Sequence, residues 1–563
     1  MIRKWGLSNF KSFYDKTELE LAPLTVLTGT NSSGKSSFIQ SMLLIAQTLC
    51  NPISSRELVL NGPLVKMGFV GDIKSDENKE INIFFSCNKE ESEYDKIGCS
   101  LYFDSNEKVN SLEFSLSETD KLKAKRFDGK SNELDIENAS GDLKAKLENT
   151  EKLSLNHFLP FNFFHSDSYY DFIYNETASH FANSLFDDYI DEDEFPESIS
   201  ESKNMYSSSI LGFIKKYLSN IIDINIINKL FSDENYDSYK DDIFKNKTEQ
   251  ANALNTLKKH RESFIQQLST VYYKWLMSQK EGISPDVIST ATRYIGNFFS
   301  SSLKYLGPLR FLGHVHPFSL ADDPKDVGVS GEYTAFVIDA FKNEQVEYVA
   351  PENVATCFDG NFEYSQDTLM AALDSWLNYL EVGEKIILDQ EGQAGYKLKV
   401  KQVHDNKPRN LTQVGVGISQ VLPVLVTCLL AEKGSTLIFE QPELHLHPKV
   451  QSRLADFFIS MSLLGKQCIV ETHSKYFIDI LKLRICQSLL MNNKTIEGMT
   501  KIYYFDKPGF STRIIPITMD QYGNYSVWPK GFFDEVQNTN NEILNSINRL
   551  KGNIEAGEEL LDD

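Results

Sequence analysis

The fold of this chain is decided by GTNSSGKS, residues 29–36. Residues 24–28 before it (LTVLT) are apolar enough for a buried strand, and residues 36–44 after it (SSFIQSMLL) have the pattern of an apolar helix. Gly29 and Gly34 allow a tight loop between the two elements, and the backbone N–H groups of such a loop converge on phosphate oxygens at the helix N-terminus. This context favours a P-loop that binds a nucleoside triphosphate over a structural glycine turn.

Two side chains of this loop are expected to act on the phosphates. Lys35 is expected to neutralise the β- and γ-phosphates of ATP, and Ser36 to offer its hydroxyl to Mg²⁺. The loop residues predicted to bind the nucleotide are Asn31, Gly34, Lys35, Ser36 and Ser37. The predicted cofactors are therefore ATP and Mg²⁺.

Two further apolar strands place polar side chains near this loop. Residues 435–439 (STLIF) lead into Glu440, which is the natural partner for Mg²⁺ beside a P-loop, either directly or through another ligand. Ser36 and Glu440 are therefore the predicted metal ligands. Residues 467–472 (QCIVET) form another buried strand, and His473 follows it at the height of the phosphates in such a sheet.

A second potential anion site precedes Glu440 in the sequence. Residues 414–420 (VGVGISQ) lead into an apolar helix over residues 421–431. Ser419 and the glycines of this segment are expected at the helix N-terminus, where free N–H groups and the helix dipole favour an anion. An ordinary glycine-bearing loop before a helix is the alternative.

Together these residues resemble an ABC-type ATPase of the branch that contains SMC-type heads and the AAA-like "overcoming lysogenisation defect" ATPases. Residues 7–13 (LSNFKSF) are similar to the first strand and turn of that branch, and residues 440–448 (EQPELHLHP) to its Walker B motif and D-loop. Further stretches that resemble prokaryotic members, many of them phage-defence components, are YLGPLR (305–310) and WPKGFF (528–533). The resemblance covers roughly residues 1–75 and 300–535.

The resemblance implies an α/β fold, the head of an ABC-type ATPase, with a mixed P-loop sheet, helices and an antiparallel β subdomain. Residues 1–118 are expected to form the N-terminal half of the head, and residues 301–520 its C-terminal half. Residues 119–300 are expected from their own pattern, and not from the resemblance, to be an insertion, mainly a helical lobe. The Lys-, Asp-, Asn- and Gly-rich composition of residues 120–150 predicts a surface excursion there. Residues 521–563 are expected to form a C-terminal helical tail.

The resemblance also implies a composite ATP site. In ABC-type ATPases the signature helix of one subunit caps the ATP held by the P-loop of another. By this correspondence Gly417, Ser419 and Gln420 contact the γ-phosphate held by a partner subunit, and His473 senses the γ-phosphate within its own subunit. ATP would then join two heads, so a homodimer or a higher even assembly is expected.

One residue departs from the family pattern. ABC-type enzymes usually place a catalytic glutamate after the Walker B acid, and this chain has Gln441 there. An amide can hydrogen-bond the attacking water but cannot take its proton, and general-base assistance is typically worth ~10²–10⁴ in rate. The predicted catalytic residues are Glu440, Gln441 and His473, with slow hydrolysis. Glu443 is the alternative acid, although it follows Pro442, where we expect the strand to turn.

Cysteine usage favours a cytoplasmic location. The seven cysteines are odd in number and include no C-x-x-C pair, which is typical of a reducing compartment. The first residues lack the apolar region of a signal peptide, and the longest apolar stretch is about half a membrane span. Two His-X-His pairs, 314/316 and 445/447, have a spacing that suits zinc, but no cysteine or carboxylate cluster is clearly arranged around either. Structural or subunit-contact histidines are the preferred interpretation.

The charge of the chain does not predict DNA binding. Its formal net charge is −22, whereas phosphate contacts by a basic surface supply most of the affinity in nucleic-acid binders. The two local candidates are the basic runs at residues 121–126 (KLKAKR) and 258–261 (KKHR). A solvated helix face or loop is the simpler explanation of each.

Two functions from different classes remain open. In the preferred one, the protein is the ATP-driven sensor or scaffold subunit of an anti-phage defence complex, and it controls a nuclease or toxin on another chain. The stretch after His473 lacks the length and the spaced carboxylates that a Toprim nuclease needs. In the alternative, the protein is an ATPase of DNA repair or chromosome maintenance that acts on DNA directly. The acidic charge, Gln441 and the lack of a long coiled-coil pattern favour the first.

Overall fold

The computed structural model describes residues 1–88, 97–126, 133–165, 258–278, 285–310, 323–390, 396–402, 407–411, 415–519 and 535–558, except positions 54 and 149, and also positions 176–179, 216, 255, 524, 525, 527 and 529. The chain divides into two units. The first contains residues 1–145, 155–161 and 286–563, and the second contains residues 146–154 and 162–285.

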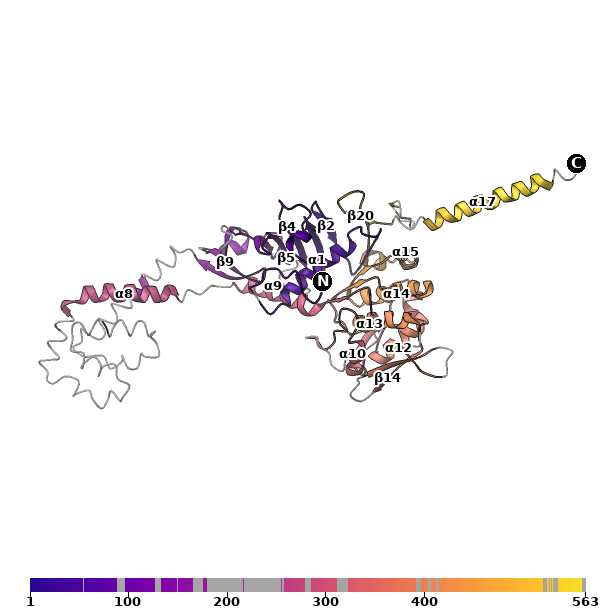
Figure 1. Cartoon of the computed structure of the whole chain (residues 1–563). Coiled ribbons are helices and arrows are strands. Elements are labelled where there is room, and N and C mark those ends of the chain that lie inside the picture. The colour runs from indigo at the N-terminus through magenta and orange to yellow at the C-terminus, as the bar shows by residue number, and fades with distance from the viewer. Residues whose placement is uncertain are drawn as a thin grey trace. The chain divides into compact units, whose positions relative to one another are not determined.

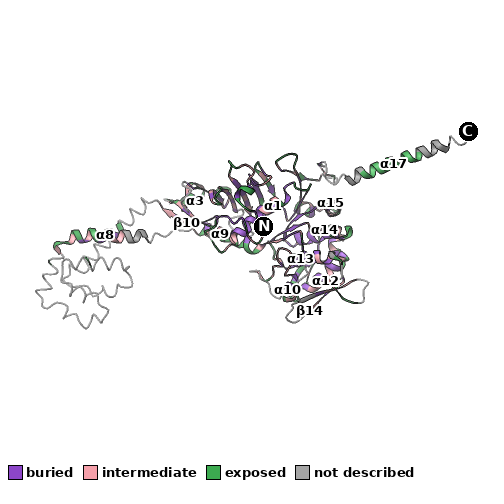
Figure 2. Ribbon diagram, in the orientation of Figure 1, coloured by how far each residue is buried: buried purple, intermediate pink, exposed green. Residues whose placement is uncertain are grey.

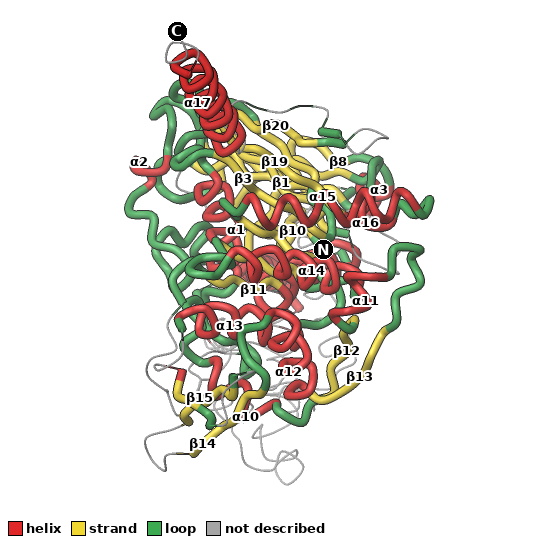
Figure 3. Tube along the Cα trace, turned by 90° about the vertical axis from the view of Figure 1, so that its right-hand side faces the viewer, coloured by secondary structure: helices red, strands yellow, loops and turns green. Residues whose placement is uncertain are grey.

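The P-loop follows a central strand of a mixed sheet in the first unit. Its strand order is β11-β17-β18-β3-β19-β20. The strands are β11 (Leu303–Leu306), β17 (Thr436–Glu440), β18 (Gln467–Glu471), β3 (Leu24–Gly29), β19 (Thr500–Asp506) and β20 (Arg513–Ile517). Every pair is parallel except β19 and β20, and β3, β19 and β20 lie side by side in Figure 3. Because the carboxyl ends of parallel strands meet at one edge, Gly29, Glu440 and Glu471 end their strands on the same side.

The predicted buried strands before Glu440 and His473 are present. Every residue of β17 and β18 is buried, as expected for parallel strands covered on both faces. The helices that carry the motifs are α1 (Lys35–Leu49), α13 (Val416–Leu430), α14 (Pro448–Leu463) and α15 (Lys475–Leu490). In Figures 1 and 3, α14 lies between α13 and α15. Its Phe457 packs edge-on against Trp376 of α12 (Leu369–Leu380), with ring centroids 4.9 Å apart.

The first unit also contains an antiparallel sheet with the strand order β8-β7-β6-β5-β4-β1-β2. Its strands are β1 (Ile2–Ser8), β2 (Thr17–Glu20), β4 (Ile81–Cys87), β5 (Ile97–Phe103), β6 (Val109–Ser115), β7 (Lys121–Lys125) and β8 (Glu133–Ala139). This sheet corresponds to the antiparallel β subdomain that the resemblance implies. It extends beyond the expected domain boundary at residue 118, which falls between β6 and β7.

The prediction of a surface excursion over residues 120–150 is wrong for β7 and β8. In β7 (KLKAK) Leu122 and Ala124 are buried and the three lysines are exposed. This alternation has the period of a strand with one buried face, and the lysine-rich composition concealed it. The last residue of the basic run at 121–126, Arg126, is buried and forms an ion pair with Glu57 at 2.7 Å.

The other described helices and strands complete both units. They are α2 (Val70–Ile73), α3 (Asp142–Lys146), β9 (Thr150–Asn156), β10 (Leu159–His165), α8 (Arg261–Ser278), α9 (Asp286–Asn297), the π-helix Phe298–Ser302, α10 (Thr334–Phe341), β12 (Gln345–Val349), α11 (Pro351–Thr356), β13 (Tyr364–Thr368), β14 (Lys385–Gln390), β15 (Tyr396–Lys401), β16 (Arg409–Asn410), α16 (Thr495–Met499) and α17 (Glu535–Glu558). Most of the predicted helical lobe lies outside the described residues. Within the predicted tail, α17 is exposed along residues 539–551 (Figure 2).

A buried lysine closes the C-terminal end of α13. Lys466 is 5% exposed, and its Nζ donates to the carbonyl oxygens of Cys428 at 2.8 Å and Leu429 at 3.2 Å. These carbonyls belong to the last turn of the helix, where no intrahelical N–H is available to them. Burial lowers the pKa of Lys466 to about 8.

Lys466→Met is expected to lower the free energy of unfolding by ~1–3 kcal/mol at neutral pH, because buried carbonyls lose their donor. The folded pKa of about 8 lies below the ordinary value of 10.5. Between these values the unfolded chain binds more protons, so this lysine stabilises the wild type increasingly as pH rises. Denaturant unfolding of both proteins across this pH window measures the difference. A difference that does not grow with pH would contradict the assignment.

Candidate active site

The P-loop joins β3 to α1 and is shaped by two glycines with positive φ. Gly29 has a φ of 141° and Gly34 a φ of 103°. A Cβ at Gly29 would lie 2.1 Å from the carbonyl oxygen of Phe505, and one at Gly34 would lie 2.5 Å from Thr512 Oγ1. Because neither position has room for a side chain, the loop is held tightly against β19 and the start of β20.

Lys35 is folded back onto its own loop. Its side chain is 3% exposed, and Nζ donates to the carbonyl oxygens of Thr30 at 2.8 Å and Gly29 at 3.2 Å. Glu471 Oε1 lies 4.0 Å away. Burial lowers the pKa of Lys35, and the nearby Glu471 opposes this effect. The ammonium group thus has partners that phosphate oxygens can replace.

A pair of carboxyl groups lies beside Lys35. Glu440 and Glu471 are register partners on β17 and β18, and their side chains are hydrogen-bonded to each other. Burial raises the pKa of Glu471 to about 8, and Glu440 adds to this effect, whereas Lys35 opposes it. Tyr305 donates to Glu440 Oε1 at 2.7 Å, and the Ser36 hydroxyl donates to Glu471 Oε2 at 3.5 Å.

Glu471 was missed by the sequence analysis. The available signal was an acidic residue at the end of an otherwise apolar strand, QCIVE, next to the predicted His473. The structure places it with Lys35, Ser36 and Glu440. Hydroxyl and carboxylate oxygens are the ligands that Mg²⁺ prefers in proteins, so the predicted ligands Ser36 and Glu440 fit the magnesium ion of an ATP·Mg²⁺ complex.

Arg310 connects the signature segment, residues 414–420, to the end of β17. Its guanidinium donates to the carbonyl oxygens of Glu440 at 2.6 Å and Gln441 at 3.4 Å, and burial lowers the pKa of Arg310 to about 10. The Gln420 amide donates to the carbonyl oxygen of Arg310 at 2.8 Å. Gln420 is 5% exposed, so its side chain faces its own subunit. Its expected contact with a partner's γ-phosphate stays a prediction.

Gly417 and Ser419 lie in the first turn of α13, after Gly415 as N-cap. Both are partly buried, and neither is among the described residues that line the cavity beside the P-loop. Both residues therefore lie at a helix N-terminus as predicted, and they do not line the ATP site of their own subunit.

The predicted histidine lies at the edge of the site with its backbone fixed. The backbone N–H of His473 donates to Glu443 Oε1 at 2.7 Å. Burial lowers the pKa of His473 to about 4, and Lys35 contributes to the shift, so the imidazole is neutral at physiological pH. Glu443 is 6% exposed and is absent from the described cavity lining. The structure thus indicates that Glu443 positions the backbone of His473.

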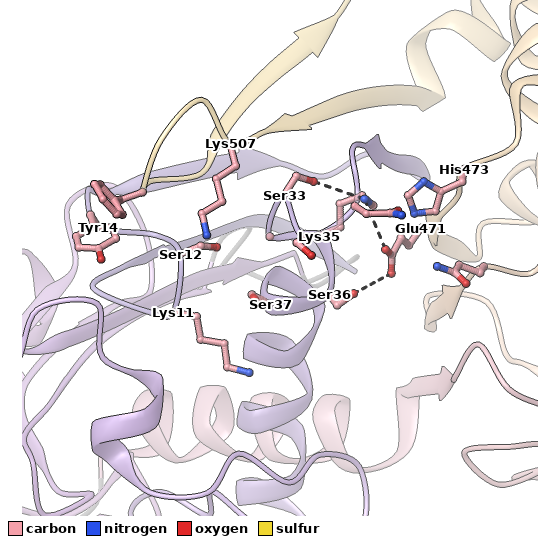
Figure 4. Close-up of a pocket in the computed structure, with 15 residues that line it drawn as sticks. Lys11, Ser12, Tyr14, Ser33, Lys35, Ser36, Ser37, Glu471, His473 and Lys507 are labelled. Carbon is pink, nitrogen blue, oxygen red and sulfur yellow. Dashed lines mark hydrogen bonds and ion pairs between the residues drawn. The ribbon is translucent and has the colours of Figure 1, made fainter. Parts of the chain in front are cut away.

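A cavity of about 690 Å³ lies in front of the P-loop, within the usual size range of ligand pockets. Its lining residues are Lys11, Ser12, Tyr14, Asn31, Ser32, Ser33, Gly34, Lys35, Ser36, Ser37, Gln441, Glu471, His473, Lys507 and Phe510 (Figure 4). Tyr14 and Phe510 are 38% and 86% exposed. The sequence analysis missed these two aromatics and Lys507. Lys507 and Phe510 lie between β19 and β20, and Tyr14 lies between β1 and β2, so only the fold brings them to the P-loop.

The His445-X-His447 pair has a structural explanation. His447 caps α14, and its Nδ1 accepts a hydrogen bond from the backbone N–H of Lys449 at 3.3 Å. His445 has a positive φ of 63° in the preceding turn. Within the described ranges no three His, Cys, Asp or Glu residues cluster as metal ligands. The 314/316 pair lies outside the described residues.

Comparison with known families identifies the kind of domain that contains this cavity. A family model described as "AAA ATPase domain" matches residues 1–304 and 332–478. A second model, described as a protein of unknown function (DUF3696), matches residues 498–543. The first match and the two sheets confirm the predicted fold class, an α/β ATPase head. Its helical insertion lobe stays a prediction. Among the helices that the structure describes, none combines the length and the hydropathy of a membrane span.

Solved structures of SMC heads are similar to this chain at low identity. One is the Smc head domain of Pyrococcus furiosus with an extended coiled coil, bound to the C-terminal domain of ScpA. It is 11% identical to this chain, the match covers 92% of this chain and 96% of the Pyrococcus chain, and the TM-score is 0.36. The SMC head domain of Thermotoga maritima is 8% identical, with coverages of 92% and 99% and a TM-score of 0.33. No curated protein sequence matches the chain.

Proposed function

The chain belongs to the AAA ATPase domain family, and we propose that it binds ATP·Mg²⁺, hydrolyses ATP slowly and dimerises through ATP. In this proposal it is the sensor or scaffold subunit of a cytoplasmic anti-phage defence complex and controls a nuclease or toxin on another chain. One observation carries the ATPase part: Lys35, Gln441, Glu471 and His473 line one cavity, and Glu440 is the register partner of Glu471 on the neighbouring strand.

The side chains of this site would act in sequence as ATP enters. Lys35 exchanges the carbonyl oxygens of its loop for the β- and γ-phosphates. The hydroxyl of Ser36 and the carboxylate of Glu440 hold Mg²⁺, which neutralises the phosphate charge when bound. The neutral imidazole of His473 reaches the γ-phosphate, and Gln441 orients the attacking water by hydrogen bonding. Because Gln441 cannot accept a proton, turnover is slow.

Dimerisation is supported by the position of the signature segment. Gly417 and Ser419 occupy the first turn of a 15-residue helix, α13, where backbone N–H groups favour an anion. Neither residue lines the cavity of its own subunit among the described residues. A γ-phosphate held by a second subunit is therefore the anion that this helix end would bind.

Ser419→Arg is expected to keep ATP binding and to abolish the ATP-dependent dimer, because a long cation would fill the space between the helix end and the partner's phosphates. ATP binding is measured by titration with a fluorescent analogue, and assembly by light scattering. Ser546→Arg, at an exposed position of α17, is the matched control and should dimerise as the wild type does. An ATP-dependent dimer that survives Ser419→Arg removes Ser419 from the interface.

The proposed function is tested by adding ATP·Mg²⁺ to the purified chain and following its mass and phosphate release together. A larger, long-lived species with little released phosphate is the expected result. Rapid phosphate release would contradict slow turnover. A mass that does not change would contradict dimerisation through ATP.

An ATPase of DNA repair or chromosome maintenance that acts on DNA directly remains the second candidate function. The described surface gives it little support at the basic run of β7. Lys123 lies 3.6 Å from both Glu113 and Glu137, so neighbouring carboxylates offset its charge. Strong, salt-dependent binding of duplex DNA by the isolated chain would favour this second function over the first.

A further inference from the structure

Glu471 has no part in the mechanism described above, although it lies at the centre of the site. It ends β18 opposite Glu440 at the end of β17. Glu471 is 2% exposed and Glu440 is 8% exposed. Two carboxyl groups buried side by side repel each other when both are ionised, so this arrangement calls for a proton or a cation between them.

The neighbours of Glu471 are the groups that hold ATP·Mg²⁺. Its Oε2 lies 3.5 Å from the Ser36 hydroxyl oxygen, and its Oε1 lies 4.0 Å from the ammonium of Lys35. Lys35 must turn to the phosphates when ATP binds. The carboxyl pair then loses its nearest positive charge at the moment when Mg²⁺ arrives.

We propose that Glu471 is a second carboxylate ligand of the Mg²⁺ ion in the ATP site, together with Glu440 and Ser36. Two Mg–O bonds laid end to end span ~4.1 Å, so Ser36 Oγ and Glu471 Oε2 lie close enough for one ion to bind both. Tyr305, which donates to Glu440 Oε1 at 2.7 Å, orients the other carboxylate. The inference rests on the proposed ATP binding and assigns a new residue to it.

This assignment also gives a reason for the acidic residue on β18. Where an acid would usually follow Glu440, the chain has the neutral Gln441. Glu471 is the corresponding second negative charge, supplied by the neighbouring strand at the same level of the sheet. Its contact with the Ser36 hydroxyl places it on the metal side of the P-loop, so we assign it to metal binding and not to activation of water.

The test measures metal binding apart from turnover. Mn²⁺ is titrated into the full chain saturated with a non-hydrolysable ATP analogue, and free Mn²⁺ is followed by electron paramagnetic resonance. Glu471→Gln is expected to weaken Mn²⁺ binding at least tenfold. Its affinity for the analogue in EDTA should stay within threefold of wild type. Glu113→Gln, which removes a carboxylate at an exposed position of β6, should keep the Mn²⁺ affinity of the wild type.

Equal Mn²⁺ affinity of Glu471→Gln and wild type would overturn the inference, and so would an equal loss in both variants. A wild type that binds no ATP analogue would overturn the proposed function itself. Thermal unfolding shows whether Glu471→Gln folds. If it does not, Glu471→Asp keeps the charge on a shorter side chain and should bind Mn²⁺ with reduced affinity. Wild-type affinity in that variant would equally contradict the ligand role.

Discussion

Lys35→Ala is expected to lower the affinity for ATP at least ~30-fold, because truncating one partner of a buried, hydrogen-bonded charge pair costs ~2–5 kcal/mol or more. The ammonium is 3% exposed and is the P-loop cation that would meet the β- and γ-phosphates. Hydrolysis and ATP-dependent dimerisation should be lost with it. A titration with a fluorescent ATP analogue measures the change.

A second lysine of the cavity, Lys507, provides a matched control for Lys35→Ala. Lys507 lines the same cavity and is exposed on the β19–β20 hairpin. Because solvent screens an exposed charge, Lys507→Ala should weaken ATP binding much less than Lys35→Ala. The Lys35 variant also loses the three hydrogen bonds of Nζ to its own loop, so its thermal unfolding is compared with that of the wild type. A folded Lys35→Ala protein that binds ATP normally would contradict the P-loop assignment.

The parts of the site that the sequence predicts are those encoded locally. The spacing of residues 29–36 identifies the loop because each residue type has a fixed task within a few positions. The strands before Glu440 and His473 are recognisable because parallel strands are apolar along their whole length. Both motifs then lie beside the P-loop, since parallel strands end at one edge of the sheet.

The missed residues depend on contacts between distant segments. Arg310 contacts the carbonyl oxygens of Glu440 and Gln441, about 130 residues further along the chain. Phe510 and Lys507 reach the cavity only because β19 pairs with β3. No local pattern marks Phe510 and Lys507, and the resemblance of YLGPLR (305–310) gave Arg310 no role in the site. Glu471 is an intermediate case, because its place in an apolar strand was visible but its partners were not.

The error at β7 and β8 has a different origin. A composition rich in lysine and asparagine predicts a surface loop, whereas the alternation in KLKAK indicates a strand. One face of such a strand needs only Leu122 and Ala124 to join the core. Periodicity therefore outweighs composition for a strand that has one side in solvent.

Gln441→Glu is expected to raise the rate of ATP hydrolysis by ~10²-fold or more, because it adds the general base that the wild type lacks. The backbone at this position is fixed: the Gln441 N–H donates to the Glu471 carbonyl oxygen at 2.8 Å, and Arg310 donates to the Gln441 carbonyl. The residue lines the cavity, so the new carboxylate would occupy the place of the amide. Phosphate release under single-turnover conditions measures the effect.

The affinity for ATP should change little in this variant, because the added group acts on water and not on the bound phosphates. Gln441→Ala, which removes the polar group altogether, should hydrolyse ATP more slowly than the wild type. The ATP-dependent dimer should also become short-lived in Gln441→Glu, since hydrolysis would remove the γ-phosphate that joins the two heads. A dimer that persists while phosphate is released rapidly would show that the γ-phosphate does not hold the subunits together. An unchanged single-turnover rate would show that the absence of a carboxylate at position 441 does not limit hydrolysis.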